Sequence, residues 1–460
     1  MWQSLPAKLT TGYHSKLLFC QTKVMESQRL HSYNAAIKAL NGLQTNAAVL
    51  EKIKSERLKK YVNQNLAETK KYLAQMSISS QDLNDLPVIH VSGTKGKGST
   101  CAFAESILRH HGLKTGFYSS PHLVSATERI RINGQPLSQK AFADYFWRVY
   151  SQIASSDPKP SYFKFLTIMA YHVFIEEKVD VALVEVGIGG AYDCTNVLEK
   201  PVAVGITLLD YDHTKVLGNT IEDIAWHKAG IMKAGSIAFA NPSQPEAALK
   251  VLYQRSKEIG ASLFLAPPIE DYDWGQFPKD LGLYRDVHGY NASLALQLAR
   301  YFLTRTLPNQ ASGFALKWPE ALGLRLCFWP GRSQVVKRTE SETYFLDGAH
   351  TEQSMWACRN WFDHIQVKSS ASKPYKILLF NSTGDRDPEI LLAPLANFKF
   401  DLAIFCTNET KHEDLSADNT NLNFSFGYAL RKCEANQVTK TKRLRDEDCS
   451  LLARPLLGVL

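Results

Sequence analysis

Two hydrophobic patterns alternate along this 460-residue chain. Short segments that are almost wholly apolar predict strands buried on both faces, as at the centre of a parallel sheet. Longer segments, in which apolar residues recur every three or four positions, have the spacing of amphipathic helices. Strands that alternate with helices indicate a parallel sheet covered on both sides, so we expect an α/β fold. The apolar segments lie at 88–91, 179–186 and 202–209, and a further short strand is expected at 115–118.

Two further segments predict local detail. Phe103, Ile107 and Leu108 fall on one face of a helix that is expected to follow residue 99. The segment 129–134 alternates apolar and polar residues and ends in an Asn-Gly pair. This pair favours a tight hairpin turn, so we expect a strand that turns back on itself there.

The alternation of strands and helices begins again after the segment Trp329-Pro330-Gly331-Arg332. We therefore place a domain boundary near residue 328, with a larger domain over 25–328 and a smaller, Rossmann-like α/β domain over 329–460. Residues 409–460 are polar and lose periodicity, so we expect no further strand or helix there. In the smaller domain strands are predicted at 343–346, 377–380 and 402–405, and a helix at 351–362.

Composition excludes several classes of protein. Hydrophobic residues make up 45% of the chain and charged residues 21%, the balance of a soluble globular protein with a substantial core. No apolar run approaches the ~18 residues of a membrane-spanning helix. The net charge of +8 is mild and diffuse; it suits an anionic small substrate and does not argue for nucleic acid. The 8 cysteines are scattered, which predicts free thiols in a reducing compartment.

The first 24 residues differ from the rest of the chain. They contain three lysines and several hydroxyl residues, and no acid precedes Glu26. This composition is typical of a mitochondrial presequence, although a disordered leader fits it equally well. Met25 would provide a second start. We therefore expect a mitochondrial form from Met1, in the matrix or at the inner membrane, and a cytoplasmic form from Met25.

A glycine-rich loop follows the first predicted strand. Gly93, Gly96 and Gly98 alternate with lysines up to Ser99, where the next helix is expected. A strand, such a turn and a helix can cradle phosphates, because backbone amides and the helix dipole point at the anion. The spacing departs from the usual G-x-x-x-x-G-K-[ST] motif. We favour phosphate binding over a merely solvated loop, and expect a P-loop-type, parallel-sheet ATP-binding domain.

Polar residues follow three other predicted strands. Ser120, Glu185 and His213 lie at their carboxyl ends, where parallel sheets bind ligands. A hydroxyl and a carboxylate beside a phosphate loop could hold Mg²⁺, which prefers hard oxygen ligands. Imidazole is an unusual ligand for Mg²⁺, so chemistry alone suggests that His213 lies behind the ligands or acts as a general base. Taken singly, each residue is more often a structural polar group.

Lys228 lies on the apolar face of a predicted helix. Thr220 and Asp223 form a capping pattern, and Ile221, Ile224 and Lys228 then share one face. A lysine on a buried face must extend its amine to solvent, pair with an acid or lose its charge. The first outcome is the commonest on this pattern alone. A neutral amine could instead react with CO₂ to give a carbamate, which is an oxygen ligand.

Six segments of the chain carry longer motifs: 91–100, 119–123, 128–134, 184–196, 329–332 and 346–351. They resemble folylpolyglutamate synthases of the eukaryotic type, which belong to the Mur ligase superfamily. The similarity covers about residues 30–407 in the family's order, and the variant glycine loop is the one that the Mur ligases share.

The resemblance implies an ATP-dependent ligase of one-carbon metabolism, which adds L-glutamate to the γ-carboxylate of tetrahydrofolates and their polyglutamates through an acyl phosphate. It implies ATP and Mg²⁺ as cofactors, a carbamylated Lys228, and a monovalent cation as a further cofactor. Lys97, Lys228 and His350 would then be catalytic. The residues implied for ATP are Gly96, Lys97, Gly98, Ser99, Asn291, Arg332 and Asp347, and those for Mg²⁺ are Ser120, Glu185 and His213.

The sequence also departs from the family. Val287-His288 stands near Asn291, where the family usually carries His-Gln, and the family's second domain continues with a strand and a helix that 409–460 lacks. The alternative is therefore a truncated, weakly active or inactive folate- and ATP-binding relative. A kinase or GTPase is disfavoured by the loop spacing and by the absence of an evident guanine-recognition motif. Activity on dihydropteroate stays open, and we expect a monomer.

Overall fold

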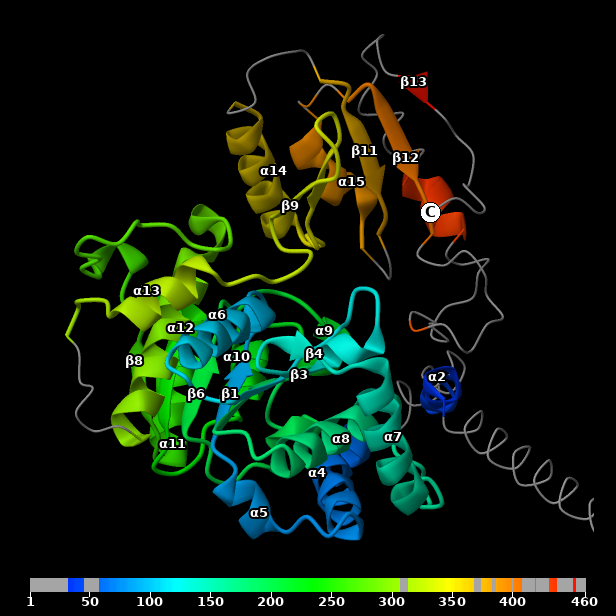
Figure 1. The fold of residues 1–460 in the computed structure, drawn as a ribbon, viewed down its shortest axis with the longest axis vertical. Helices are drawn as coiled ribbons and strands as arrows, with labels where there is room; N and C mark the ends of the chain where they lie inside the picture. Colours follow the sequence, from blue (N-terminus) through cyan, green and yellow to red (C-terminus); the bar gives the residue numbers. More distant parts are fainter. Residues whose placement is uncertain are drawn as a thin grey trace, which may run out of the picture.

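The computed structural model describes residues 32–44, 58–306, 313–367, 374–382, 386–396, 398, 400–407, 418, 430–436 and 450–451. The predicted leader over 1–24 and the second start at Met25 lie outside these residues, as does most of 409–460. The described residues form two lobes, and all described residues before 329 belong to the larger one (Figure 1).

An eight-stranded mixed sheet forms the centre of the larger lobe. Its strands are β1 (Val88–Ser92), β2 (Thr115–Tyr118), β3 (Ile130–Ile132), β4 (Gln135–Pro136), β5 (Val181–Glu185), β6 (Ala203–Ile206), β7 (Ile237–Ala240) and β8 (Ser262–Leu265). They follow the order β4-β3-β2-β5-β1-β6-β7-β8. In this order the six strands β2, β5, β1, β6, β7 and β8 are parallel. β3 pairs antiparallel with β2, and β4 pairs antiparallel with β3.

The predicted parallel sheet is confirmed for the strands from β2 to β8 in the sheet order, and it is wrong for the edge formed by β3 and β4. The predicted Asn-Gly hairpin is present: Asn133 and Gly134 have φ values of +51° and +75° and turn the chain back between β3 and β4. β4 therefore runs antiparallel to β3, which itself pairs antiparallel with β2.

Helices cover both faces of the sheet. On β5, Ala182 and Val184 pack with α7 and α8, whereas Val181 and Leu183 pack with α6 and α12. This two-sided burial explains the continuous apolar run in the sequence. The helices of the larger lobe are α2 (Tyr33–Asn41), α4 (Leu58–Gln75), α5 (Ser80–Asp85), α6 (Lys97–His110), α7 (Gln139–Ile153), α8 (Tyr162–Glu176), α9 (Thr214–Leu217), α10 (Ile221–Ala229), α11 (Glu246–Ile259), α12 (Arg285–Thr306) and α13 (Trp318–Arg325).

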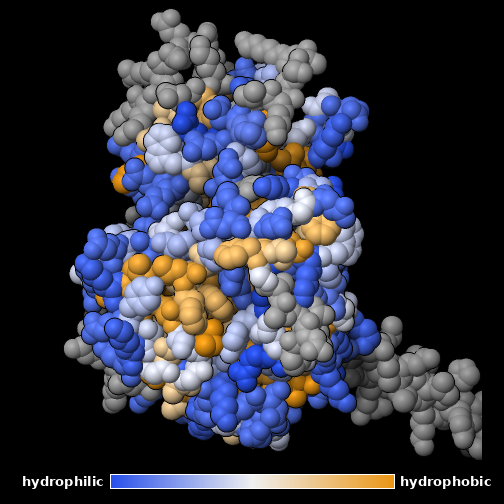
Figure 2. Space-filling view, turned by 90° about the vertical axis from the view of Figure 1, so that its left-hand side faces the viewer, coloured by the Kyte–Doolittle hydropathy of each residue, from blue (hydrophilic) through white to orange (hydrophobic). Residues whose placement is uncertain are grey.

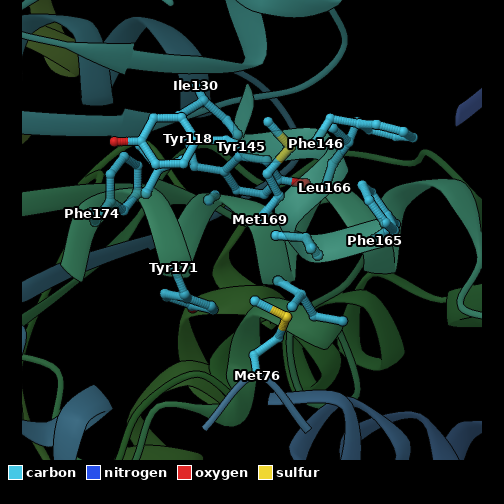
Figure 3. Packing of buried hydrophobic residues seen from close by; sticks show 14 of the residues in the cluster. Met76, Tyr118, Ile130, Tyr145, Phe146, Phe165, Leu166, Met169, Tyr171 and Phe174 are labelled. Carbon is cyan, nitrogen blue, oxygen red and sulfur yellow. The ribbon is translucent and has the colours of Figure 1, made fainter. Parts of the chain in front are cut away.

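The core beneath α7 and α8 is rich in aromatic side chains. Phe146 and Phe165 approach with ring centroids 4.9 Å apart, and Tyr118 from β2 lies among them (Figure 3). The phenol of Tyr118 stays paired, because it meets the Thr167 hydroxyl at 3.1 Å. This packing fixes the end of β2 and therefore the start of the loop that carries Ser120.

The helix α6 is buried more completely than its sequence predicts. Phe103, Ile107 and Leu108 are buried as expected, but so is every residue from 99 to 108. The reason is that α12 and α13 pack against α6 on the side away from the sheet.

The smaller lobe contains two small sheets. An antiparallel pair is formed by β9 (Gln334–Lys337) and β10 (Thr343–Leu346), and a parallel set by β11 (Ile377–Phe380), β12 (Leu402–Phe405) and β13 (Ser450–Leu451). The helices α14 (Glu352–Val367) and α15 (Pro388–Leu392) accompany them. Met355, Phe380 and Ala403 belong to a separate small core, so the lobe has its own hydrophobic centre.

Four predicted strands match the observed bounds: β2, β10, β11 and β12. The expectation of no regular structure in 409–460 is wrong, because a helix forms at 430–436 and β13 adds to the edge of β12. Free thiols are confirmed for the cysteines in the described part of the chain, which are Cys101, Cys194, Cys327, Cys358, Cys406 and Cys433.

Trp329 anchors the link between the lobes. Its ring lies 5.1 Å from the ring of Phe117, and the guanidinium of Arg131 lies 5.1 Å from its centroid. A Cβ atom at Gly98 would come within 3.1 Å of its indole nitrogen. The link is therefore fixed to the larger lobe directly beside the glycine loop.

One side of the larger lobe, next to α13, is partly apolar. Phe314, Trp318, Leu326 and Phe328 are exposed there, and hydrophobic residues gather on this side of the molecule (Figure 2). Even so, none of the helices in the described ranges combines the length and the hydrophobicity that a membrane span requires.

Candidate active site

The glycine loop connects β1 to α6 and is fixed by its backbone. The amides of Thr94 and Lys95 both donate to the carbonyl of Leu208, each at 3.0 Å, which ties the loop to the end of β6. Gly96 caps α6 with a φ of +86°, and the amide of Thr100 is bonded to its carbonyl. The amides of residues 97–99 have no helical partner, as at every helix start, and can bind an anion.

Gly96 also allows a close approach by α12. A Cβ atom at this position would lie 2.2 Å from Oδ1 of Asn291. The Asn291 amide is held by Thr100, whose hydroxyl lies 3.4 Å from Oδ1, and donates to Nδ1 of His288 at 3.3 Å. The loop and Asn291 therefore form one packed unit.

Gly96→Ala should damage this unit. The left-handed φ and the contact with Asn291 should together cost about 1–3 kcal/mol of unfolding free energy, and ATP should bind at least about tenfold more weakly. Gly235→Ala is the matched control, because Gly235 has a φ of +74° with nothing within 4 Å of its added Cβ. Thermal unfolding would measure the stability of the two variants, and titration with ATP would measure their affinity for the nucleotide. Equal ATP affinity in the two variants would contradict this view of the loop.

Two lysines meet at one carbonyl beneath the loop. Nζ of Lys97 lies 3.1 Å from the oxygen of Gly93, and Nζ of Lys228 lies 2.7 Å from the same atom. Lys228 is only 3% exposed, so extension of its amine to solvent is ruled out. Burial, with the nearby charge of Lys97, holds the pKa of Lys228 well below its ordinary value. The neutral-amine alternative therefore fits this lysine best.

Glu185 and Ser120 lie side by side across two strand ends. The backbone amide of Ser120 donates to Oε2 of Glu185 at 3.0 Å. Glu185 is 5% exposed, and this burial raises its pKa against the opposing charge of Lys97. A carboxylate with one hydrogen bond in so buried a place suits a cation, and the neighbouring hydroxyl adds a hard oxygen ligand.

Within the described residues no three His, Cys, Asp or Glu side chains are grouped closely enough to hold a metal by themselves. A divalent ion at Glu185 would therefore need the Ser120 hydroxyl and phosphate oxygens as partners. Such a mixed set of protein and phosphate ligands is usual for Mg²⁺.

His213 belongs to a charged group that sequence reasoning did not find. It follows β6 in a left-handed conformation, with a φ of +52°. Oδ2 of Asp212 lies 4.0 Å from Nε2 of His213, 3.7 Å from Nζ of Lys95 and 3.9 Å from Nε2 of His350. Burial would raise the pKa of Asp212, but these neighbours outweigh it and hold that pKa well below its usual range.

The smaller lobe contributes three of the predicted residues. Asp347 accepts the amides of Ser333 at 2.7 Å and Ala349 at 2.9 Å, which fix its carboxylate, while burial raises its pKa. The guanidinium of Arg332 donates to the carbonyl of Gly331 at 3.0 Å. Nδ1 of His350 donates to the carbonyl of Gly348 at 2.8 Å. Backbone contacts thus orient all three side chains.

A cleft of about 1230 Å³ brings the predicted residues together between the lobes. Lys228 lies just behind its wall, bonded to Gly93. The predicted residues that line the cleft are Gly96, Lys97, Gly98, Ser99, Ser120, Glu185, Asn291, Arg332, Asp347, His213 and His350.

The cleft also contains polar residues that were not predicted as site residues. Arg129 donates through Nε to Nδ1 of His122 at 2.8 Å. Asp193 accepts the hydroxyl of Thr195 at 2.6 Å and the amide of Ile188 at 3.1 Å. Arg129 and Asp193 lie in segments that resemble the family, which was the available signal for them. Asp212 directly precedes His213, so its signal was its position after the end of a strand.

The chain was compared with known proteins, and a search of family models found no match. Human mitochondrial folylpolyglutamate synthase is 47% identical over 431 residues, which cover 88% of this chain and 73% of the human protein. The chain belongs to the folylpolyglutamate synthase family. The folylpolyglutamate synthase of Neurospora crassa is 39% identical, over 88% of this chain and 80% of the fungal protein.

Solved structures of folylpolyglutamate synthases share the α/β fold. The Mycobacterium tuberculosis enzyme, complexed with ADP and AMPPCP, matches with a TM-score of 0.66 at 24% identity, over 84% of this chain and 85% of that one. A bifunctional folylpolyglutamate synthase/dihydrofolate synthase has Mn, AMPPNP and L-glutamate bound. It matches with a TM-score of 0.60 at 28% identity, over 75% of this chain and 80% of that one.

Proposed function

We propose that this chain joins L-glutamate to the γ-carboxylate of tetrahydrofolates and their polyglutamates through an acyl phosphate. Its family membership makes it an ATP-dependent ligase that adds glutamate to folates. The observation that carries the finer proposal is the single cleft, in which a glycine loop, a buried carboxylate and an oriented histidine face one another.

A carboxylate is a poor acyl donor, so ATP must first phosphorylate it. Positioning and charge neutralisation supply most of the catalysis in such a transfer. In our proposal the amides of residues 97–99 and the ammonium of Lys97 hold the phosphates, with Arg332 from the other lobe. Asn291 and Asp347 hold the remainder of the nucleotide. The amine of glutamate then attacks the acyl carbon and phosphate leaves.

Ser120, Glu185 and His213 are proposed to hold Mg²⁺. The ion would neutralise phosphate charge and stabilise the charge that develops on the transferred group. Glu185 fits this role because its buried carboxylate has one hydrogen bond and no salt bridge in the described structure. His213 fits less directly, since imidazole is an unusual ligand for Mg²⁺, and it could act from behind the ligands.

Lys228 is proposed to be carbamylated. The neutral amine attacks the carbon of CO₂, a C–N bond forms, one C=O electron pair moves to oxygen, and the amine releases a proton. Its burial beside Lys97 favours the neutral amine, and the resulting carbamate anion would face that ammonium.

We further propose the domain division near residue 328, with a P-loop-type first domain and a Rossmann-like second domain, and a monomeric enzyme.

The mammalian relatives are named mitochondrial. We accordingly propose mitochondrial and cytoplasmic forms that differ in their start at Met1 or Met25. Expression of each form with a C-terminal fluorescent tag would test this, since only the longer form should enter mitochondria.

The activity can be tested directly. The protein is mixed with MgATP, L-glutamate and tetrahydrofolate, and the folate product is weighed by mass spectrometry. Successive additions of glutamyl units support the ligase. Binding of ATP without a gain in folate mass would instead support the weakly active relative.

A further inference from the structure

Lys95 lies in the glycine loop, but its side chain leaves the loop and contacts the other lobe. Its Nζ lies 3.2 Å from Nε2 of His350, a residue 255 positions further along the chain. Its backbone amide is bonded to Leu208, so the start of the side chain is fixed in the larger lobe. The side chain of Lys95 is 18% exposed and that of His350 is 39% exposed, so the contact is only partly sheltered from water.

The contact determines which hydrogen bonds the two ring nitrogens of His350 make. Because Nδ1 donates to the carbonyl of Gly348, the proton of a neutral ring lies on Nδ1. Nε2 of the neutral ring then accepts from the ammonium of Lys95, whereas in a protonated ring the same atom donates toward Asp212. The carboxylate of Asp212, 3.7 Å from Lys95 and 3.9 Å from His350, lies beside both groups. The ring is thus held from both sides, once by each lobe.

We propose that Lys95 is a positioning residue, which holds His350 of the smaller lobe opposite the phosphate loop. This inference rests on the proposed function, in which His350 serves the reaction from the second lobe. Lys95 would then act on the amino-acid half of the reaction, because the residue that it orients belongs to the second lobe and not to the loop whose amides are proposed to bind phosphate.

The neighbouring lysine of the loop has a different orientation. Lys97 begins α6, and its Nζ returns to Gly93 beneath the loop. Lys95 precedes Gly96 and reaches Asp212 and His350 instead. We therefore assign Lys97 to the nucleotide and Lys95 to the second lobe, although the two lysines are only two positions apart.

Lys95→Met tests this division, since methionine keeps most of the side-chain length without its charge. We expect KM for glutamate to rise about tenfold, the range of one lost charge-assisted hydrogen bond, while the KM for ATP changes less than twofold. Lys95→Arg should recover most of the loss. Lys140→Met, on an exposed lysine of α7, is the matched control and should behave as the wild type.

A double-mutant cycle with His350→Gln separates the outcomes. If Lys95 acts through His350, Lys95→Met adds little to the loss already caused by His350→Gln. Equal losses in both backgrounds, or a rise in the KM for ATP as large as that for glutamate, would overturn the proposal and make Lys95 a phosphate ligand.

A readout without turnover keeps this test apart from the proposed function. In ¹⁵N spectra of the whole protein, Lys95→Met should shift the Nε2 resonance of His350, and Lys140→Met should not. An unchanged resonance overturns the positioning role even if the wild type adds glutamate. Conversely, a wild type that adds no glutamate refutes the proposed function, whatever the spectrum shows.

Discussion

Lys228→Ala is expected to lower kcat for glutamate addition by about 10³-fold, the usual cost of a group that stabilises transferred charge. Lys228 is 3% exposed and its amine is bonded to the carbonyl of Gly93 beneath the glycine loop, so no neighbouring side chain can take its place from solvent. Lys228→Met should be equally inactive but well folded, because methionine fills the space without a buried amine. Steady-state kinetics and thermal unfolding would check both variants.

The sign of the stability change follows from the direction of the pKa shift. Burial, then the charge of Lys97, lowers the pKa of Lys228 in the folded protein. Between that lowered pKa and the unfolded value of about 10.4 the unfolded chain binds more protons, so this group makes stability rise with pH. Below this window the buried charge costs the most. In CO₂-depleted buffer, where the lysine is not carbamylated, Lys228→Met should therefore raise the Tm, and by more as the pH falls through this window; an unchanged Tm would contradict the burial argument.

Carbamylation adds a second test on the same residue. Wild-type activity should fall in CO₂-depleted buffer and return with bicarbonate, whereas Lys228→Ala should regain some activity with acetate or formate. A wild type that is insensitive to CO₂, together with an inactive variant that no carboxylate restores, would leave Lys228 essential and refute the carbamate.

Glu185→Gln should separate activity from stability even more clearly. We expect kcat to fall about 10²–10³-fold, as when one charge-stabilising group is lost, and the Mg²⁺ needed for half-maximal activity to rise. The amide can still accept the hydrogen bond of Ser120. Because burial raises the pKa of Glu185, its ionised form destabilises the fold near neutral pH, and the neutral glutamine should leave the Tm unchanged or higher.

Glu105→Gln is the contrasting control. Glu105 is equally buried, but it is paired with Arg109 at 2.9 Å and with Thr115 at 2.6 Å, away from the cleft. Its replacement should lower the Tm and leave the Mg²⁺ requirement unchanged. Identical behaviour of the two glutamine variants would show that Glu185 has only a structural role.

The central strands could be predicted because burial on both faces leaves an uninterrupted apolar run. Strands β5 and β6 are examples. β11 could be predicted from its wholly apolar sequence, although Ile377 and Leu379 are exposed. The edge strand β8 was missed, because three of its four residues are exposed and its pattern is weak. The strand β13 gains its structure from pairing with β12, which no local pattern records.

The site shows the same division. The glycine loop, Ser120, Glu185 and His213 follow from one rule, that ligands bind where parallel strands end. Lys228 could be placed on a buried face, but its partner at Gly93 lies 135 positions away and could not be deduced. Asp212 and the contact between Lys95 and His350 were missed for a related reason, since they depend on how two lobes meet.

The fixed position of Trp329 has a mechanical consequence. The indole packs on Phe117 and against Gly98, so the chain enters the smaller lobe at the end of the cleft that the glycine loop forms. A rotation of the smaller lobe about this pivot would displace nearby Arg332 only slightly. The side of the smaller lobe that is farthest from Trp329 would move through the largest distance. In the proposed function, a nucleotide on the glycine loop would thus stay close to Arg332 while the opposite side of the cleft widens for folates whose tails differ in length.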